Sequence, residues 1–548
     1  MLSAAPPQVL EATEYGLVAD GVADDGLAVQ RLLDAASAVD GPVELRFPEN
    51  RTVYVKSMPT RYVFPWRGIS DTILDGGGCT FVLDPKLRFM ELTESRNVTV
   101  RRLNVDFSPL PFADGTITAA NAGERYLDVR LAEYVAAPPI GGPTREDGEQ
   151  AFFAMLWHQG AYAVESHHCW VERMESIGDG RTVRVHAAES FDAYGDIVSG
   201  EWWVSLPVPG IAHRYGPGEC FKLRDNDTIT FEDVGLWSAP WFGFGVSRNR
   251  GEVTFRRVNI RPKPGTDRRM SIWRDGFHVK GNSGVLLWEE CTLSSMNDDA
   301  FNISTHSSAV LRVLEPNRIE VRQKFPLLPI PWREGATVIA VDEPARRLLG
   351  TATVVAVETG PEPALIQGHP AAPLATLTLD LPIPGLAEGV MVWDPAQCNP
   401  DTTLRRCRID MSCRMQSPVR IEHCEVNALL WFYGEHVEGG FPHDMVVCDS
   451  ILRRGRGNPS TVLSVSGAPS PEAGAPEAAA RPRAIHGLRI ENNEIWGGVA
   501  IQGVEGLTLA DNRFLEQGAP AAILGCYDAE ARNNTMASGS LVVEPPKP

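Results

Sequence analysis

Features that point to nucleic acids or membranes are missing from this sequence of 548 residues. Basic side chains are in the minority, because 51 Lys and Arg stand against 70 Asp and Glu and give a formal net charge of -19. A polyanion such as DNA or RNA would be repelled, so no nucleic-acid partner is expected. No run of eighteen apolar residues occurs, so no membrane partner is expected either. This charge does not exclude neutral ligands such as sugars.

The sequence also lacks the usual signals of export and of cysteine-based metal sites. Residues 1–7 contain no basic segment followed by an apolar stretch, so no secretory signal is predicted. The compartment therefore stays unassigned between the cytoplasm and secretion after processing. The 10 cysteines include no CxxC pair, which argues against a zinc knuckle. Their even number leaves disulfides open.

Length and composition are compatible with two architectures, a chain of several domains and an elongated repeat fold. Hydrophobic residues make up 43% and charged residues 22%, as is typical of globular proteins. A chain of 548 residues exceeds what one compact core usually holds, so either several domains or an elongated repeat fold is expected.

A short repeated pattern favours the repeat fold. Apolar residues recur at relative positions 0, 2, 5 and 7, with Asn sometimes at position 5. The pattern fits residues 98–105, 229–236, 253–260, 286–293, 419–426, 488–495 and 507–514, and looser copies start at Thr402 and Met445. The period of two predicts a strand with one buried face, and the step of three predicts a bend before a second short strand.

One such unit cannot bury its own apolar face, but units stacked along an axis can. Most neighbouring copies follow one another at intervals that suit one coil of a solenoid. We therefore predict an all-β chain that forms a right-handed parallel β-helix. Position 5 holds Cys291, Cys407 and Cys424, and then Asn493 and Asn512. We expect these residues to form inward ladders in which the cysteines are structural rather than reactive.

The pattern is interrupted twice, by segments such as 126–131 and 374–379 that alternate like strands of another kind. Two β-rich, barrel-like insertions beside the β-helix are therefore expected. The predicted division is 1–110 for an N-terminal cap and the first coils, 111–215 for the first insertion, 216–310 for the central coils, 311–395 for the second insertion and 396–548 for the last coils, with a flexible loop near 467–484.

The N-terminal cap contains a predicted helix. Apolar residues from Val29 to Ala36 have helical spacing, and either Asp24 or Asp25 can cap the helix. An amphipathic helix at this place would cover the open end of the β-helix and its exposed strand edge.

Two segments of the central coils carry acids at matching positions. Arg274-Asp275-Gly276-Phe277 aligns with Asp298-Asp299-Ala300-Phe301 at the interval of one coil, and Trp241-Phe242-Gly243-Phe244 precedes the first segment by a similar interval. If the three last phenylalanines stack inside, Asp275 stacks on Asp299 while Asp298 lies beside it. Adjacent parallel strands are about 4.8 Å apart, so the three carboxylates would converge on one small surface.

Converging carboxylates suit the cleavage of a glycosidic bond. Like charges raise one pKa, so that one carboxyl can donate a proton while another stays ionised as a base. Trp241, Phe242 and Trp273 are placed to stack on the apolar face of a sugar. Two other interpretations stay open, namely turn residues at β-helix corners and a calcium site. His278 and His306 are either sugar contacts or ordinary polar residues.

These motifs resemble glycoside hydrolase family 110, the β-helical exo-α-1,3-galactosidases that act on blood-group-B-type and related glycans. The resemblance rests on residues 274–278, on residues 296–303 and on the spacing between them. It implies removal of terminal α-linked galactose with inversion, by Asp275 as the acid and by Asp298 with Asp299 as the base pair, without a metal or a cofactor. The residues predicted to bind the substrate are Trp241, Trp273, Arg274, His278, Asn297 and His306.

Two alternatives stay open. Polygalacturonase-like β-helix hydrolases share an Asp-Gly segment followed by Asp-Asp, but their Gly-His-Gly segment is absent after Asp299. A non-catalytic carbohydrate-binding β-helix, such as a phage or surface adhesin, would not need three converging acids. The expected partner is thus a carbohydrate with terminal α-galactose, and association into a homo-oligomer is left open.

Overall fold

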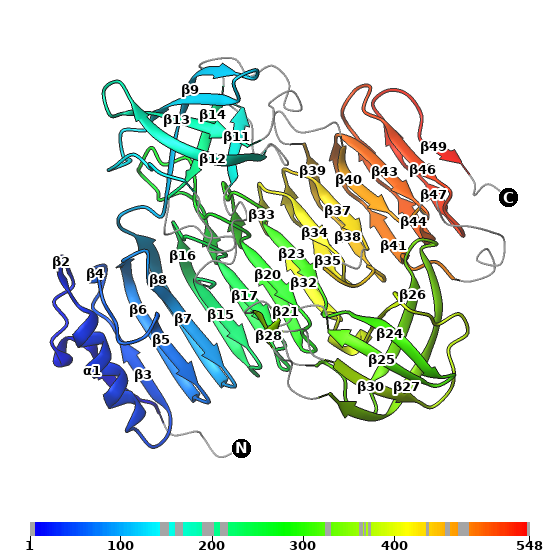
Figure 1. The fold of residues 1–548 in the computed structure, drawn as a ribbon, viewed down its shortest axis with the longest axis horizontal. Helices are drawn as coiled ribbons and strands as arrows, with labels where there is room; N and C mark the ends of the chain where they lie inside the picture. The colour runs from blue at the N-terminus through cyan, green and yellow to red at the C-terminus, as the bar shows by residue number, and fades with distance from the viewer. Residues whose placement is uncertain are drawn as a thin grey trace.

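The computed structural model describes residues 6–142, 153–158, 168–188, 202–208, 218–323, 330–360, 365–366, 369–370, 374–434, 438–454, 461–468 and 482–544. Strands dominate, and the one α-helix of this part of the chain, α1 (Gly26–Ser37), lies at the N-terminal end. Stacked parallel strands form an elongated β-helix, and two closed barrels stand beside it (Figure 1). None of the described helices is long and apolar enough to cross a membrane.

Two parallel sheets form the walls of the β-helix. The 23-stranded sheet contains β1 (Gln8–Glu11), β2 (Asp20–Asp24), β3 (Val43–Arg46), β4 (Thr52–Val55), β6 (Ser70–Leu83), β8 (Arg96–Phe107), β16 (Ile229–Leu236), β18 (Val253–Arg256), β19 (Asn259–Ile260), β21 (Val285–Glu289), β22 (Thr292–Leu293), β32 (Asp401–Arg405), β33 (Arg408–Ile409), β35 (Arg420–Glu422), β36 (Glu425–Val426), β38 (Val446–Cys448), β39 (Ile451–Arg453), β41 (His486–Glu491), β42 (Glu494–Trp496), β44 (Glu505–Ala510), β45 (Arg513–Phe514), β47 (Glu530–Arg532) and β48 (Thr535–Met536). The 12-stranded sheet contains β5 (Tyr62–Arg67), β7 (Arg88–Thr93), β15 (Phe221–Arg224), β17 (Phe244–Ser247), β20 (Phe277–Lys280), β23 (Phe301–Ser304), β34 (Cys413–Met415), β37 (Leu430–Tyr433), β40 (Thr461–Ser466), β43 (Gly498–Gln502), β46 (Ala521–Leu524) and β49 (Val542–Glu544).

The repeated apolar pattern sets the register of the coils. Ile229 pairs with Val253, and Val253 pairs with Leu286 on the following coil. In the other sheet Phe277 pairs in parallel with Phe301. Their rings stack with centroids 5.3 Å apart, and both side chains are fully buried. The prediction of a parallel β-helix with adjacent phenylalanine-bearing coils is therefore confirmed.

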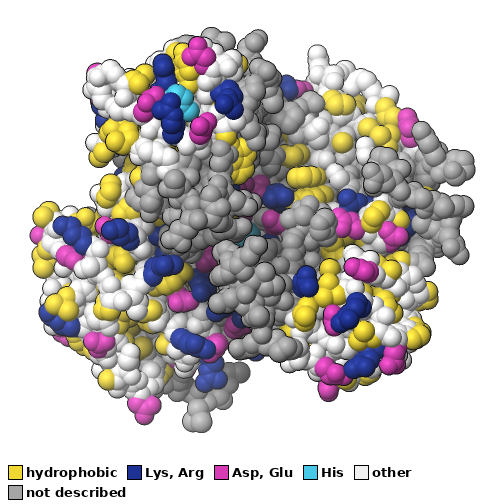
Figure 2. All heavy atoms as spheres, in the orientation of Figure 1, with side chains coloured by type: hydrophobic (Ala, Val, Ile, Leu, Met, Phe, Trp, Pro, Cys, Tyr) yellow, Lys and Arg dark blue, Asp and Glu magenta, His cyan; other side chains and the backbone are white. Residues whose placement is uncertain are grey.

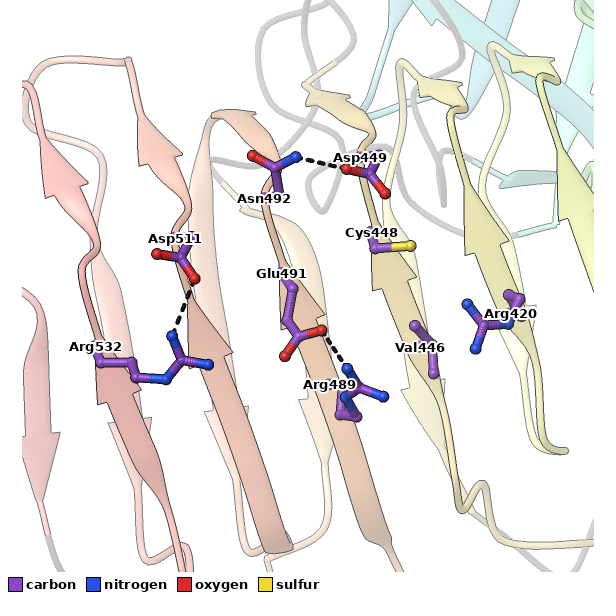
Figure 3. Close-up of a pocket in the computed structure, with 9 residues that line it drawn as sticks. All are labelled: Arg420, Val446, Cys448, Asp449, Arg489, Glu491, Asn492, Asp511 and Arg532. Atoms are coloured by element: carbon purple, nitrogen blue, oxygen red, sulfur yellow. Dashed lines mark hydrogen bonds and ion pairs between the residues drawn. The ribbon is translucent and has the colours of Figure 1, made fainter.

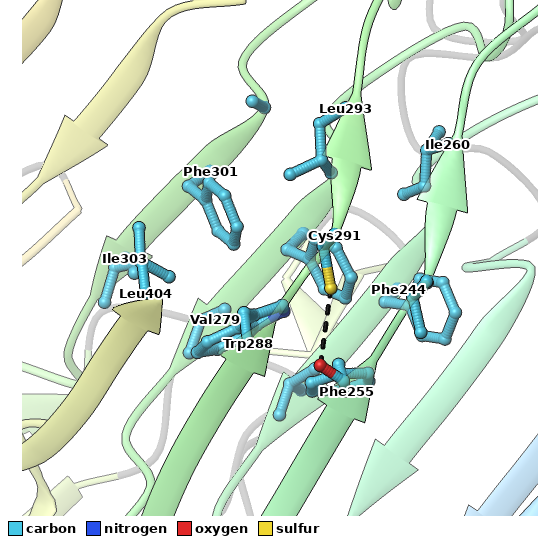
Figure 4. Packing of buried hydrophobic residues seen from close by; sticks show 14 of the residues in the cluster. Phe244, Phe255, Ile260, Val279, Trp288, Cys291, Leu293, Phe301, Ile303 and Leu404 are labelled. Atoms are coloured by element: carbon cyan, nitrogen blue, oxygen red, sulfur yellow. Dashed lines mark hydrogen bonds between the residues drawn. The ribbon is translucent and has the colours of Figure 1, made fainter. Parts of the chain in front are cut away.

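Aromatic and sulfur side chains fill the space between the sheets (Figure 4). Trp288 stacks on Phe255 at 5.1 Å and meets Phe301 edge-on at 5.3 Å. The thiol of Cys291 donates to the carbonyl of Phe255 at 3.3 Å. Full burial of each large apolar side chain stabilises the fold by about 1.5–3 kcal/mol, so this column holds the central coils together.

The predicted ladders at position 5 are present. The backbone N–H of Cys407 donates to Sγ of Cys424 at 3.4 Å, and the side-chain amide of Asn493 donates to Oδ1 of Asn512 at 3.0 Å. All ten cysteines are among the described residues, and every one is a free thiol. The cysteines of this ladder therefore pack as core residues, and the disulfide alternative is wrong.

A second asparagine ladder was not predicted. It runs along another corner through Asn226, Asn249, Asn282 and Asn399, whose amides donate from one coil to the next at 2.9–3.0 Å. The last step joins residues on either side of the second barrel, so the sequence spacing hides it. Each amide satisfies a buried backbone or side-chain group that would otherwise destabilise the fold.

Helix α1 covers the first coils, and Val29 and Leu32 are fully buried. Asp25 stands at the N-cap position, but its carboxylate accepts instead from the backbone of Val18 at 2.8 Å. Asp24 accepts from the N–H of Gly26 at 3.1 Å. Of the two predicted capping residues, Asp24 therefore serves the helix and Asp25 holds the preceding turn.

Both insertions are closed six-stranded barrels with apolar interiors of their own. The first consists of β9 (Phe112–Asn121), β10 (Tyr126–Leu131), β11 (Phe153–His158), β12 (His168–Ile177), β13 (Thr182–Ala187) and β14 (Trp202–Pro207). The second consists of β24 (Ser308–Glu315), β25 (Arg318–Gln323), β26 (Thr337–Asp342), β27 (Arg347–Thr359), β30 (Leu374–Leu379) and β31 (Met391–Trp393). The remaining elements are β28 (Leu365–Ile366), β29 (His369–Pro370) and the 3-10 helices η1 (Ala12–Tyr15) and η3 (Pro395–Gln397).

The two barrel-like insertions are thus confirmed, whereas the domain boundaries drawn from the sequence stay a prediction. Most of the loop predicted near 467–484 lies outside the described residues.

Candidate active site

The three predicted acids lie where two strands of the 12-stranded sheet begin. Asp275 comes just before β20, and Asp298 and Asp299 come just before β23. The N–H of Gly276 donates to the carbonyl of Asp299 at 2.8 Å, which places Asp275 beside Asp299 as the spacing predicts. One carboxylate oxygen from each acid lies within 4.8 Å of the other two. The structure therefore brings the three acids, the acid triad below, to one point.

Cations and hydroxyl groups surround two members of the acid triad. Arg274 Nη1 lies 3.0 Å from Oδ2 of Asp298, and Arg414 Nε lies 3.6 Å from Oδ2 of Asp299. The hydroxyl of Ser412 donates to Oδ1 of Asp299 at 2.6 Å. These partners place positive charge beside both carboxyl groups and a hydrogen-bond donor on Asp299.

Asp275 is in a different environment. Its side chain is buried, with 3% exposed, whereas 21% of the Asp298 side chain is exposed. Burial, followed by the negative charge of Asp298, raises the pKa of Asp275 well above its ordinary value. The acid triad therefore combines a buried carboxyl group whose pKa is raised with two carboxyl groups beside cations, and such a difference in environment is what acid–base catalysis uses.

A fourth acid next to the triad was not predicted. Glu438, after β37, accepts from Nζ of Lys280 at 2.9 Å and lies 4.0 Å from Nη1 of Arg414. Burial raises the pKa of Glu438, but the ammonium of Lys280 and other nearby cations outweigh it and hold this pKa below its ordinary value. Glu438 therefore adds an ionised carboxylate beside the triad and contributes to the raised pKa of Asp275.

The predicted aromatic residues differ in their accessibility. Trp241 and Trp273 are buried in an apolar cluster with Phe112 and Met270, between the first barrel and the coils. Phe242 is partly exposed, and its ring stacks on His278 at 4.5 Å. Phe242 is therefore better placed than either tryptophan to contact a ligand. It packs against the buried cluster that contains both tryptophans.

Arg274 links this aromatic group to the acid triad. Its guanidinium lies 5.4 Å from the ring of Trp241 and 5.9 Å from the ring of Phe242, while it pairs with Asp298. Such cation–π contacts restrict the side chain, so the orientation of Asp298 depends on the aromatic cluster.

Asn297, directly before Asp298, and His306, beyond the other end of β23, are both buried. Asn297 Oδ1 accepts from the hydroxyl of Ser205 at 2.6 Å, so it joins the coil to β14 of the first barrel. Both ring nitrogens of His306 lack a hydrogen-bond partner among the described residues. Burial, then the charge of Lys280, lowers the pKa of His306 to about 3, and the same two causes hold the pKa of His278 well below its ordinary value. Both imidazoles are therefore neutral at pH 7.

A stacked aromatic pair continues the surface on the next coil. The rings of Trp431 and Tyr433 are 3.9 Å apart, and the guanidinium of Arg414 lies 5.4 Å from the ring of Tyr433. Arg414 pairs in register with Trp431 and also with Asn302 on the preceding coil. Sequence spacing does not indicate this row, because the whole second barrel lies between Asn302 and Arg414 in the sequence.

The acid triad is also a set of hard oxygen ligands of the kind that Ca²⁺ prefers. The oxygens that lie within 4.8 Å of one another are close enough to share an ion after small side-chain rotations. Arg274 and Arg414 already supply positive charge there. The absence of a metal from this site stays a prediction.

On the face shown in Figure 2, charged side chains of both signs are scattered over the barrels and the coils. A separate groove of about 460 Å³ lies on the outer face of the 23-stranded sheet (Figure 3). Four of its charged side chains form two pairs, Arg489 with Glu491 at 2.6 Å and Arg532 with Asp511 at 3.1 Å. This groove therefore offers fewer groups for chemistry than the acid triad does.

No protein-family model matches the chain. In sequence it is similar to curated proteins. Alpha-1,3-galactosidase B of Bacteroides thetaiotaomicron is 23% identical over 75% of this chain and 68% of that protein. Alpha-1,3-galactosidase A of Akkermansia muciniphila is 35% identical over 15% of this chain and 14% of that protein.

Among solved structures, the A-module of a mannuronan C-5 epimerase from Azotobacter vinelandii is 11% identical, with a TM-score of 0.35 over 98% of this chain and 100% of that one. The surface adhesin PfbA of Streptococcus pneumoniae is 10% identical, with a TM-score of 0.38 over 96% and 91% of the two chains. The sequence matches to alpha-1,3-galactosidases confirm the resemblance indicated by the acidic motifs.

Proposed function

We propose that this protein is an exo-acting glycoside hydrolase that removes terminal α-linked galactose, in α-1,3 linkage, from glycans. The observation that carries the proposal is the acid triad, in which one buried carboxyl group with a raised pKa and two carboxyl groups beside cations meet within 4.8 Å. The named function of the similar proteins, alpha-1,3-galactosidase, supplies the sugar and the linkage.

In the proposed reaction, Asp275 donates its proton to the glycosidic oxygen as the bond to the anomeric carbon breaks. Asp298 and Asp299 remove a proton from the attacking water, whose oxygen forms the new bond to that carbon. The released products are galactose and the shortened glycan. The base pair then holds one extra proton and Asp275 lacks one, and proton exchange with water restores both. General acid or base catalysis of this kind is typically worth about 10²–10⁴ in rate.

The greater exposure of Asp298 supports a second assignment of roles. An exo-acting enzyme binds the terminal sugar innermost, so the leaving glycan points to solvent. The proton donor then lies toward solvent, which favours Asp298, with 21% of its side chain exposed, over the buried Asp275. The raised pKa of Asp275 supports the first assignment, and the effect of leaving-group acidity on each variant distinguishes the two.

Inversion is the proposed stereochemical course because of the family resemblance. Carboxyl groups of inverting enzymes are about 6.5–9.5 Å apart, and those of retaining enzymes about 5–5.5 Å. The 4.8 Å limit within which the nearest triad oxygens lie is closer to the retaining value, which makes retention the competing course.

The test measures hydrolysis and the anomer of the released sugar. The protein is incubated with an α-1,3-linked digalactoside, with p-nitrophenyl α-galactoside and with polygalacturonate, and NMR follows the first anomer formed. Release of β-galactose from the first substrate supports the whole proposal, and release of α-galactose supports a retaining galactosidase. New reducing ends from polygalacturonate alone, or binding of galactosides without turnover, would overturn it.

A further inference from the structure

Two histidines and an aspartate meet on the later coils, apart from the acid triad. His443 precedes β38 and His486 begins β41, and an isolated parallel bridge pairs the two residues. Their rings stack with centroids 5.3 Å apart at an angle of 8°. One donor atom from each of His443, Asp444 and His486 lies within 4.8 Å of the other two.

The ring nitrogens of this cluster are incompletely satisfied. Nδ1 of His443 lies 2.9 Å from Oδ2 of Asp444. Nε2 of His443 and Nδ1 of His486 are shielded from solvent and have no hydrogen-bond partner among the described residues. Buried polar atoms without a partner are unfavourable, so these nitrogens are available for another ligand.

We propose that His443, Asp444 and His486 bind one divalent transition-metal ion of the Zn²⁺ type. Two imidazoles and a carboxylate are typical zinc donors, and a water molecule completes a tetrahedral site. Zinc lies about 2.0–2.2 Å from such donors, so the side chains draw closer than 4.8 Å when the ion binds. The side chain of Asp444 is 73% exposed, so it can turn from its contact with Nδ1 of His443 toward the ion. This proposal does not rest on the galactosidase activity.

The ion would connect two coils and steady a segment that reaches the acid triad. The strands β38, β39 and β40 separate His443 from His486 in the sequence, but the two residues are adjacent in the fold. The segment that ends at His443 begins at Glu438, which pairs with Lys280 at 2.9 Å. Within it, Phe441 stacks on Trp393 of the second barrel at 5.9 Å. A metal at His443 therefore anchors the far end of the segment that carries Glu438.

The first experiment is titration of the metal-free full chain with Zn²⁺ by isothermal titration calorimetry at pH 7, with Mg²⁺ as the comparison ion. We expect one Zn²⁺ per chain and no Mg²⁺ binding with the same stoichiometry, because imidazole is a poor ligand for Mg²⁺. A saturating excess of Zn²⁺ should also raise the unfolding temperature by about 1–3 °C, because the ion binds only the folded site.

Variants locate the ion. His443→Ala and His486→Ala should each weaken Zn²⁺ binding by about tenfold or more, and Asp444→Asn by less. His423→Ala removes an exposed histidine outside the cluster and serves as the matched control with unchanged binding. Asp298→Asn, in the acid triad, should also leave Zn²⁺ binding unchanged. His443→Gln provides a second variant if the alanine variant folds poorly.

Co²⁺ gives an independent readout, since a tetrahedral cobalt site with nitrogen donors absorbs visible light strongly. The absorption should appear with the wild-type chain and disappear with His443→Gln. No Zn²⁺ binding by the wild type, binding retained in both histidine variants, or binding lost in Asp298→Asn would each overturn the proposal.

Discussion

The acid triad and the groove on the outer face of the 23-stranded sheet are both charged, but their charges are arranged differently. In the groove, Arg489 pairs with Glu491, and Arg532 pairs with Asp511. In the triad, three carboxyl groups stand together, and the buried one, Asp275, faces the charge of Asp298. Paired charges on an exposed face contribute little more than solubility and modest stability, whereas gathered like charges are unfavourable.

This difference shows that the unfavourable arrangement of charges is concentrated at the acid triad. The coils on either side of the triad are held by fully buried aromatic columns, such as Phe277 on Phe301. A rigid, well-packed wall can hold carboxylates in an unfavourable arrangement that an exposed loop would relax.

The largest effect is expected for Asp275→Asn. If Asp275 donates the proton, turnover of an α-1,3-linked digalactoside should fall by about 10²–10⁴. Turnover of p-nitrophenyl α-galactoside should fall much less, because an acidic phenol leaves without a proton. The measurement is kcat/KM on both substrates, with Asp298→Asn in parallel. The reverse result, with Asp298→Asn the variant that spares the aryl substrate, would assign the proton donor to Asp298.

The pH dependence of stability should also separate the two regions. Because the pKa of Asp275 is raised in the folded state, its contribution to stability is fully present below the unfolded pKa near 3.9 and is lost as pH rises toward the folded pKa. The loss is at most about 1.4 kcal/mol per pH unit. The Asp275→Asn variant lacks this titration. Its unfolding temperature should therefore rise relative to that of the wild type as the pH rises.

Differential scanning calorimetry between pH 5 and pH 8 measures this difference. The groove variant Arg532→Ala provides the control, since it removes no buried carboxyl group, and its offset from the wild type should stay nearly constant. An Asp275→Asn variant that is less stable than the wild type at every pH, by a constant amount, would contradict the strained arrangement of the triad.

A smaller effect is expected for Ser412→Ala, which removes the hydroxyl that donates to Asp299 at 2.6 Å. A hydrogen bond to a charged group is worth about 1.5–3 kcal/mol, so kcat/KM should fall by about 10- to 100-fold on both substrates. Ser37→Ala is the matched control, because that hydroxyl donates at 2.8 Å to a carbonyl within α1. Unchanged activity of Ser412→Ala would show that Asp299 needs no such orientation.

The sequence predicts the coils and the acid triad for the same physical reason. Burial repeats with each coil, so the apolar pattern fixes which phenylalanines stack, and the register of Phe277 on Phe301 then places Asp275 beside Asp299. Local spacing is sufficient because no insertion separates the two segments, which lie on consecutive coils. The core sets the register of the sheet, and that register therefore also sets the positions of the acids at the site.

The rest of the site depends on contacts that local spacing does not contain. Ser412 and Arg414 belong to the next coil, but the second barrel stands between that coil and Asp299 in the sequence. Glu438 follows β37 and has no periodic pattern to mark it. The burial of Trp273 depends on Phe112, at the start of the first barrel, and sequence spacing does not indicate where a barrel packs. The substrate contacts assigned to these residues stay predictions.

The smallest effect is expected in the groove itself, for Arg532→Ala. Arg532 lies 3.1 Å from Asp511, and the two side chains are 46% and 48% exposed. Exposed ion pairs of this kind contribute about 0.2–1 kcal/mol, and salt screens them. Arg532→Ala should therefore lower the unfolding temperature by about 1 °C or less, and about 0.5 M NaCl should remove most of that difference. Galactoside hydrolysis should stay within twofold of the wild type. A loss of activity comparable to that of Ser412→Ala would contradict the contrast, because the groove would then hold a group that the reaction needs.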